Sequence, residues 1–313
     1  LLQTQVALFF DPASRAASIE RMRGANAEWD FMGRTYLVLA LANRALDRPE
    51  ERERALVMID AILEETVALE GSQGQEHFLM DYARRERFRD PGGRSVFIDG
   101  EIALMMAARQ RVEGSDRWRA PLRQRIRVIS EQMERGPVLS AESYPDECWT
   151  FCNTVGLAAI RVSDAVTGED HGALLRGWVA TARERLIDES TGMLVSSFTH
   201  DGVALDGPEG SSVFMAAHML QIVDPTFARE QYELARVHLG ASFLGFGWAR
   251  EWPGSWDGPA DVDSGPIVPI VGASAGASGM ALLGAAAFGD DAWLEELHTS
   301  LAFAAFPIRD GET

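Results

Sequence analysis

Gly272-Ala-Ser-Ala-Gly-Ala-Ser-Gly-Met-Ala281 is the stretch that decides the fold, because all of its residues are small or apolar and none is charged. It lies within a longer helical pattern over 267–287. A helix that is apolar on every side must be buried. Other helical segments, such as 50–69 and 115–134, carry one strongly charged face, which is typical of helices with one side in water. The contrast predicts an inner layer of helices covered by an outer layer.

The helical periodicity outside this stretch falls into pairs of segments. Apolar residues recur three and four positions apart within each segment, as expected for amphipathic helices. The connection inside a pair is short and the connection between pairs is long, and a short connection makes neighbouring helices antiparallel. The predicted pairs are 27–46 with 50–69, 96–112 with 115–134, 147–166 with 169–187, 209–223 with 225–240, and 267–287 with 290–304.

A repeated helical hairpin of this size builds either an open solenoid or a closed double ring. The buried first helices favour the ring, so we expect an all-α fold, an (α/α)6 toroid with the first helices inside. We expect residues 1–313 to form a single toroid domain, with residues 1–22 and the C-terminal segment supplying the sixth pair. The chain begins Leu-Leu-Gln and stops at Asp310-Gly-Glu-Thr313, so we expect one or both ends to be truncated.

The composition excludes several classes of function. The net charge of −18 disfavours nucleic acid, which binds basic surfaces. The chain has no lysine, which excludes Schiff-base chemistry and the lysine of a phosphate-binding P-loop. No apolar run reaches membrane-spanning length. We therefore expect a cytoplasmic protein that acts on a neutral small molecule without a cofactor, and the sequence is compatible with a homo-oligomer.

Ser140-Ala-Glu-Ser-Tyr-Pro-Asp-Glu-Cys-Trp-Thr-Phe-Cys-Asn153 concentrates reactive side chains more than any other stretch. Pro145 should end a preceding helix, and Asp146 can then cap a new one. Cys148 and Cys152 are four residues apart, so both thiols would lie on one face of the new helix. Two cysteines do not make a disulfide framework, and no metal-binding motif is present, so no metal is expected.

Carboxylates recur at or near the predicted starts of the inner helices. Helix capping and dipole pairing account for part of this pattern. The apolar run Val96-Phe-Ile-Asp-Gly-Glu-Ile-Ala-Leu104 is different, because a solvated face is not expected for carboxylates placed there. The recurring carboxylates are Asp30, Asp99, Glu101, Asp146, Glu147, Glu209, Asp261 and Asp263.

The long loops that precede the inner helices hold most of the aromatic and titratable side chains. An acidic mouth with aromatic walls suits a neutral substrate, either a sugar that stacks on the rings or an apolar alcohol. Each of these residues also has a purely structural interpretation as loop packing or core. The residues are His77, Phe78, Asp81, Tyr82, Tyr144, Trp149, Phe198, His200, Phe246, Trp248, Trp252 and Trp256.

Tyr144-Pro-Asp-Glu-Cys-Trp-Thr-Phe-Cys-Asn153 resembles the cysteine-bearing segment of linalool dehydratase-isomerase and its relatives. In that family a Pro-Asp pair precedes a cysteine and an asparagine at the start of an inner helix. The resemblance implies an α/α toroid with a cofactor-independent acid/base site acting on an allylic alcohol. Asp146 and Cys152 match the family motif, whereas Cys148 has no counterpart and the family's other cysteine falls within 140–143, which contains none.

The resemblance also implies a histidine, a further aspartate and a tyrosine from earlier loops. His77, Asp81 and Tyr82 are the stand-ins by location. Our leading hypothesis is a lyase or isomerase in which a carboxylic acid or tyrosine protonates a hydroxyl and a carboxylate, thiolate or histidine removes a proton. The expected catalytic residues are Asp146, Cys152, Cys148, Tyr144, His77, Asp81 and Tyr82, and the expected substrate-binding residues are Trp149, Asn153, Asp99, Glu101, Asp263, Asp261, Glu209, His200, Trp248, Trp252 and Trp256.

Two alternatives remain open from the sequence. The first is a glycosidase or epimerase on the same toroid, with two carboxylates flanking a sugar. The second is a scaffold that binds a small molecule without turning it over.

Overall fold

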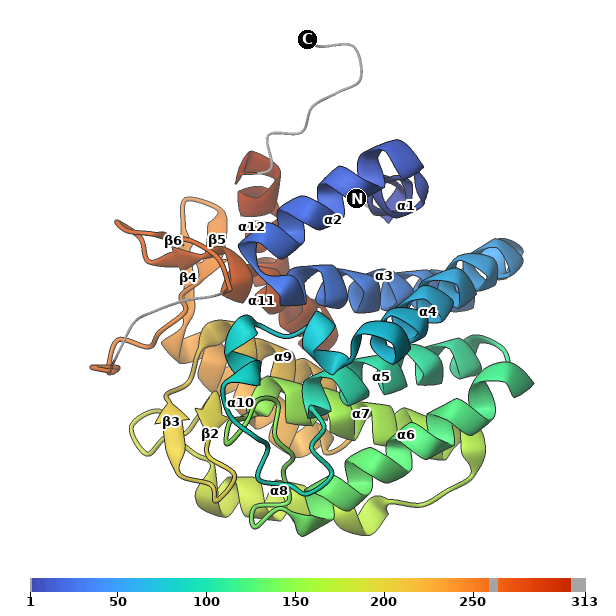
Figure 1. Ribbon diagram of the computed structural model, residues 1–313. Coiled ribbons are helices and arrows are strands. Elements are labelled where there is room, and N and C mark those ends of the chain that lie inside the picture. The colour runs from blue at the N-terminus through green and yellow to red at the C-terminus, as the bar shows by residue number, and fades with distance from the viewer. Residues whose placement is uncertain (1, 259–263, 305–313) are drawn as a thin grey trace, which may run out of the picture. The chain divides into compact units, whose positions relative to one another are not determined.

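Helices dominate the computed structural model, in which residues 2–258 and 264–304 are described (Figure 1). The predicted all-α class is confirmed. Within the described residues the helices follow one another in pairs: α1 (Leu2–Phe10) and α2 (Pro12–Ala25), α3 (Ala27–Asp47) and α4 (Arg52–Gln73), α5 (Val96–Val112) and α6 (Asp116–Arg135), α7 (Thr150–Thr167) and α8 (Gly172–Arg185), α9 (Gly210–Leu220) and α10 (Pro225–His238), α11 (Ala275–Phe288) and α12 (Asp291–Ala304).

The chain forms two compact units. The first consists of the described parts of Leu1–Cys148 and Val155–Trp178, and the second of the described parts of Trp149–Thr154 and Val179–Thr313. The single-domain toroid stays a prediction. No helix within the described residues combines the length and the apolar character that a membrane crossing needs.

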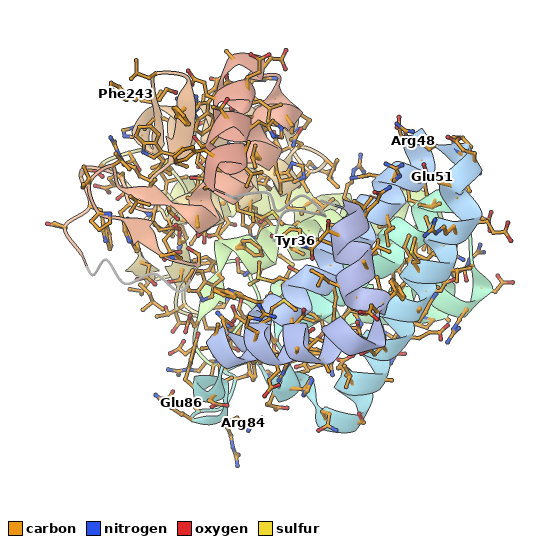
Figure 2. All side chains as sticks on the ribbon, turned by 90° about the horizontal axis from the view of Figure 1, so that it is seen from above. Tyr36, Arg48, Glu51, Arg84, Glu86 and Phe243 are labelled. Atoms are coloured by element: carbon orange, nitrogen blue, oxygen red, sulfur yellow. The ribbon has the colours of Figure 1, made fainter. Side chains whose placement is uncertain are left out.

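Helix pairs of the first unit begin and end where the sequence provides local signals. Asn26 caps α3 by accepting a hydrogen bond from the backbone N–H of Glu28 at 2.8 Å. Asp47-Arg48-Pro49 ends α3 as predicted, and the 3-10 turn η1 (Pro49–Glu51) leads directly into α4. Arg48 and Glu51 mark this turn on the surface (Figure 2). The linker is so short that α3 and α4 pack as neighbours.

The predicted contrast between inner and outer helices holds in the first unit. Nearly every residue of α5 is buried, including two acidic ones, whereas α6 buries one face and exposes a row of arginines. Two 3-10 turns, η2 (Gln75–His77) and η3 (Asp81–Arg84), lie in the long connection between α4 and α5. Arg84 and Glu86 project outward from this connection (Figure 2).

The second unit adds short hairpins where the sequence predicted plain loops. Strand β1 (Cys148–Trp149) precedes α7, and β2 (Ser197–Phe198) pairs with β3 (Ala204–Asp206). Strand β4 (Gly240–Phe243) pairs with β5 (Phe246–Ala249), and β6 (Ile267–Val268) with β7 (Ala273–Ser274).

The predicted helix over 267–287 was therefore wrong at its start. The β6–β7 hairpin occupies its first part, and α11 begins only at Ala275, where Ser274 caps it through the N–H of Ala277 at 3.1 Å. The expectation that this helix is buried on all sides was also wrong. The fully buried residues of α11 lie on one side of the helix; they are Ala277, Ala281, Gly284 and Ala285.

Glu251 organises the core of the second unit. Its carboxylate is almost fully buried and accepts hydrogen bonds from the N–H and hydroxyl of Ser211 in α9, and from the hydroxyls of Ser264 and Ser274. Gly210 allows this approach, since a Cβ there would lie 2.3 Å from the carbonyl oxygen of Arg250. One carboxylate thus joins the starts of α9 and α11.

We expect Glu251→Gln to lower the unfolding free energy by about 1–2 kcal/mol, because one of its oxygens becomes an amide nitrogen that cannot accept. Urea unfolding followed by circular dichroism measures this. The surface variant Glu233→Gln is the control and should leave the midpoint unchanged. A Glu251→Gln midpoint equal to that of the parent would contradict the assigned role.

Candidate active site

Tyr144 lies at the centre of a cluster of acidic and aromatic side chains in the first unit. Its ring is buried and stacks on Tyr82, with ring centroids 4.4 Å apart. Its hydroxyl donates to the carboxylate of Glu28 and accepts from the backbone N–H of Met80 at 3.1 Å. Burial and the adjacent Glu28 carboxylate raise the pKa of Tyr144, so its hydroxyl stays protonated. Tyr144 therefore holds the first turn of α3 against the η2–η3 connection.

Glu142 fixes the loop that carries Tyr144. Its carboxylate is 1% exposed and accepts hydrogen bonds from the backbone N–H groups of Arg89 at 2.9 Å, Asp90 at 2.8 Å and Asp146 at 2.6 Å. The backbone carbonyl of Glu142 also accepts from the N–H of Val96, the first residue of α5. One side chain thus links the segment before α5 to the Tyr-Pro-Asp turn.

Asp146 does not cap a helix, which corrects the sequence prediction. Its φ of 56° places it in the left-handed region, and its carboxylate forms an ion pair with Arg89 at 2.8 Å near the surface. Because Glu142 binds the N–H of Asp146, residues 144–147 form a tight turn closed by a bridge between Tyr144 and Glu147. The chain continues in extended form, and helix α7 begins only at Thr150.

Cys148 and Cys152 consequently do not share a helix face. Cys148 lies in β1, whereas Cys152 lies in the first turn of α7, and neither forms a disulfide. Burial raises the pKa of the Cys148 thiol, and the nearby carboxylates of Glu142, Asp146 and Glu147 raise it further. Cys148 is therefore a neutral thiol and a poor nucleophile at neutral pH. Cys152 is buried and belongs to the second unit, and its catalytic role stays a prediction.

Glu101 is an acid of the first unit with a strongly raised pKa. It lies in the middle of buried α5, and burial raises the pKa of its carboxyl to about 8, with a smaller contribution from the negative charge of Glu28. The hydroxyl of Thr35 on α3 offsets part of this rise without completing a hydrogen bond of normal geometry. Within the part of the chain that the structure describes, neither Glu101 Oε2 nor Thr35 Oγ1 has a hydrogen-bond partner. A neutral carboxylic acid with a free oxygen is the form that a proton donor requires.

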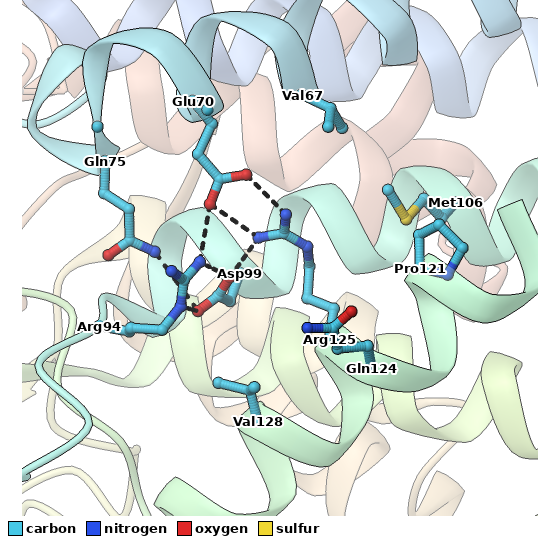
Figure 3. A pocket seen from close by; sticks show the side chains of 12 residues that line it. Val67, Glu70, Gln75, Arg94, Asp99, Met106, Pro121, Gln124, Arg125 and Val128 are labelled. Atoms are coloured by element: carbon cyan, nitrogen blue, oxygen red, sulfur yellow. Dashed lines mark hydrogen bonds and ion pairs between the residues drawn. The ribbon is translucent and has the colours of Figure 1, made fainter.

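Asp99 points to a different environment from Glu101, although the sequence placed the two together. Residues two apart on a helix face different sides. Asp99 is 1% exposed and forms ion pairs with Arg94 and Arg125, which both also contact Glu70 (Figure 3). These four side chains line a pocket of about 640 Å³ whose wall includes parts of α4, α5 and α6. All four charges are paired there, and the predicted role of Asp99 in substrate binding stays a prediction.

The structure brings together some of the predicted residues of the η2–η3 connection. Tyr82 joins the cluster, since its ring stacks on Tyr144 and its hydroxyl donates to Glu147 at 3.4 Å. His77 instead adjoins Phe78, with ring centroids 4.8 Å apart, and burial lowers the pKa of its imidazole, helped by the charge of Arg23. Asp81 is exposed at the first position of η3.

Sequence reasoning missed Glu28, Thr35 and Glu142 as members of this region. Glu28 lies two residues after the capping Asn26, so its sequence position indicates only an ordinary first-turn acid that complements the helix dipole. Thr35 lies in mid-helix between Arg34 and Tyr36 and carries no local signal. Glu142 is one of several acids in 140–153, and only its tertiary contacts distinguish it.

The predicted substrate-binding residues of the second unit lie in several separate local contacts, and their role stays a prediction. Trp252 stacks on Trp256 with ring centroids 5.1 Å apart, and Trp248 donates its indole N–H to the carbonyl of Val271 at 3.0 Å. Glu209 accepts from the hydroxyl of Ser212 at 3.2 Å. His200 is half-buried in the turn between β2 and β3. Asp261 and Asp263 lie outside the described residues.

The start of α7 shows local order in the second unit. The side-chain amide of Asn153 donates to the backbone carbonyl of Trp149 at 2.9 Å. Thr150 anchors the helix start, with its N–H bound to the carbonyl of Ser196 and its hydroxyl bound to that of Val195. In the parts of both units that are described, no three side chains of the metal-binding types come together as a metal site.

A family model described as linalool dehydratase/isomerase matches residues 98–310. The match covers more than half of the chain and includes Glu101 and the whole of 140–153. The resemblance that the sequence showed in the Tyr144–Asn153 segment is thereby confirmed. The chain belongs to the linalool dehydratase/isomerase family.

Proposed function

We propose that the protein dehydrates or isomerises a small, largely apolar allylic alcohol, with Glu101 as the proton donor. The observation that carries the proposal is the buried Glu101 carboxyl, whose pKa of about 8 keeps it protonated at neutral pH and whose Oε2 has no partner among the described residues. The family supplies the reaction class, and this site supplies the acid that the reaction needs.

The proposed reaction begins with transfer of the Glu101 proton to the substrate hydroxyl. The C–O bond then breaks, its electron pair leaves with the oxygen, and water and an allylic cation result. For dehydration, a base removes a proton from a carbon next to the cation, and a C=C bond forms. For isomerisation, water adds to the other end of the allylic cation and returns a proton to Glu101. Neither route requires a change of redox state.

Glu28 is the proposed base. Its carboxylate accepts the hydrogen bond of Tyr144, which orients it, and its negative charge acts on the Glu101 carboxyl. A neutral Glu101 carboxyl and a neighbouring Glu28 carboxylate would divide the roles of acid and base. After dehydration, the proton on Glu28 must return to Glu101 to restore the starting state.

The surroundings of Glu101 match the active site of a carbohydrate enzyme less well. A glycosidase needs two carboxyls that flank a polar ring. Thr35 and Glu101 are instead neighbours of the apolar pair Phe31 and Phe97, whose ring centroids lie 5.3 Å apart. An apolar alcohol matches this environment better than a sugar does.

The pH dependence of turnover tests the proposal. Glu101 must be protonated to act, so kcat/KM for linalool should hold at neutral pH and fall tenfold per pH unit above about pH 8. Gas chromatography of products formed between pH 6 and 10 measures the profile. The control is circular dichroism at each pH, which shows that the protein stays folded. Turnover that persists unchanged to pH 10, or no turnover of any allylic alcohol, would contradict the proposal.

A further inference from the structure

We infer that Thr35 and Glu101 form a two-point binding niche for the hydroxyl of the substrate, and for the water that this hydroxyl becomes. The inference rests on the proposed function and identifies the group on the substrate that the site recognises. It adds Thr35, which is not part of the proton-transfer scheme, as a specificity-determining residue.

The geometry of α3 and α5 places the two polar groups side by side. Phe31 and Phe97 make an edge contact between the helices. Thr35 lies four residues after Phe31, and Glu101 lies four residues after Phe97, so each is one turn further along the same face of its helix. Because the Thr35 hydroxyl also acts on the Glu101 carboxyl, the two helices run in the same direction along this contact.

Both polar groups are buried and incompletely satisfied. Thr35 and Glu101 are each 2% exposed, and neither Thr35 Oγ1 nor Glu101 Oε2 has a hydrogen-bond partner in the described residues. Leaving a buried donor or acceptor without a partner is unfavourable for each group. Two such groups on facing helices indicate that a third polar group completes them.

A hydroxyl group has the chemistry that completes this pair. Its oxygen can accept a hydrogen bond from the protonated Glu101 carboxyl. It can also donate to the Thr35 hydroxyl or accept from it, because that hydroxyl is both a donor and an acceptor. The rest of an apolar substrate then faces the Phe31–Phe97 pair one turn away. A site built to bind a hydroxyl discriminates against an analogue that lacks it, because the buried groups are left unpaired.

A comparison of two ligands tests the niche without relying on turnover. The ligands are linalool and the triene formed from it by loss of water, titrated by the change in intrinsic tryptophan fluorescence. We expect Thr35→Val to weaken linalool binding about 5- to 10-fold, the effect of one lost hydrogen bond, and to leave triene binding unchanged. Thr35→Ser, which keeps the hydroxyl, should bind linalool nearly as the parent does.

Thr66→Val is the matched control. Thr66 is also fully buried, but its hydroxyl is satisfied: it donates to the carbonyl of Ile62 at 2.7 Å and accepts from Arg34 at 3.5 Å. This variant should leave the preference for linalool over the triene unchanged. Thr35→Val should keep or raise the melting temperature, because it removes a buried unpaired hydroxyl, so a loss of binding cannot be attributed to unfolding.

The outcomes separate the niche from the proposed reaction. Selective loss of linalool binding without any turnover in the parent would support the niche and overturn the proposed function. Normal turnover with an unchanged ligand preference in Thr35→Val would overturn the niche and leave the function standing, and would mean that the two groups hold a permanent water. Failure of the parent to bind either ligand would overturn both.

Discussion

Glu101→Gln is expected to produce a protein that is inactive but more stable than the parent at neutral pH. The amide has nearly the same shape as the neutral carboxyl and cannot donate a proton to a leaving hydroxyl. Loss of a general acid typically lowers the rate 10²- to 10⁴-fold, and we expect kcat for linalool to fall by about that factor. The loss should appear in kcat rather than in KM.

The gain in stability follows from the raised pKa of Glu101. Burial raises this pKa from 4.5 to about 8, so the carboxyl is neutral in the folded state and ionises on unfolding between these two values. Its contribution to stability is fully present below pH 4.5 and is lost as the pH rises to about 8. At pH 7 the parent has lost about 3 kcal/mol of unfolding free energy in this way. The Glu101→Gln variant loses none, because glutamine does not titrate.

Urea unfolding of both proteins between pH 5 and 8 measures this effect. The stability difference should widen by about 1.4 kcal/mol per pH unit in favour of Glu101→Gln. Glu51→Gln is the control, since Glu51 lies on the surface and pairs with Arg44 through Nη2 at 2.6 Å. That variant should keep full turnover. A stability difference that stays constant with pH would show that Glu101 is ionised in the folded state and would remove the basis of the acid assignment.

Glu142→Ala is expected to destabilise the first unit by about 2–4 kcal/mol. The substitution leaves three partly or fully buried backbone N–H groups without an acceptor, those of Arg89, Asp90 and Asp146. Each unpaired buried donor costs about 1–3 kcal/mol, and partial access to water reduces the sum. The tight turn that follows Tyr144 loses its anchor, so the hydroxyl of Tyr144 should no longer hold Glu28.

Glu142→Gln serves as the matched variant for this prediction. Its remaining carbonyl oxygen can accept from Arg89 and Asp146, both of which bind the same carboxylate oxygen, and only the N–H of Asp90 loses its partner. We expect Glu142→Gln to lower the unfolding free energy by about 1 kcal/mol. Thermal unfolding by near-ultraviolet circular dichroism follows both variants. Equal melting temperatures for Glu142→Ala and the parent would show that the three amides find other acceptors.

These two acids illustrate why the candidate site was only partly predictable. The sequence pointed to Glu101 because a carboxylate within an apolar run is expected to be buried. Burial is indeed the main cause of its raised pKa. The sequence placed equal weight on Asp99, because two acids in one run look alike until neighbouring helices are placed. Arg125, from α6, and Glu70, from α4, contact the Arg94–Asp99 side of α5, whereas α3 brings only Thr35 and the charge of Glu28 to Glu101.

The segment 140–153 shows the opposite balance. Its concentration of polar groups and its family resemblance were readable from the sequence. Its backbone was not, because Asp146 lies at a φ of 56° in a tight turn that the bridge between Tyr144 and Glu147 closes. Glu142 anchors this turn by accepting from the N–H of Asp146, and α7 begins only at Thr150, which separates Cys148 from Cys152.

The sequence alone determined the helical class, the pairing of helices along the chain and their approximate bounds, since apolar periodicity and local breaks such as Asp47-Arg48-Pro49 act over a few residues. It also determined the absence of lysine chemistry. Only the tertiary structure decided which acid is neutral. Ionisation depends on desolvation and on charges from other helices, and α3, α4 and α6 surround neighbouring acids of α5 with different partners.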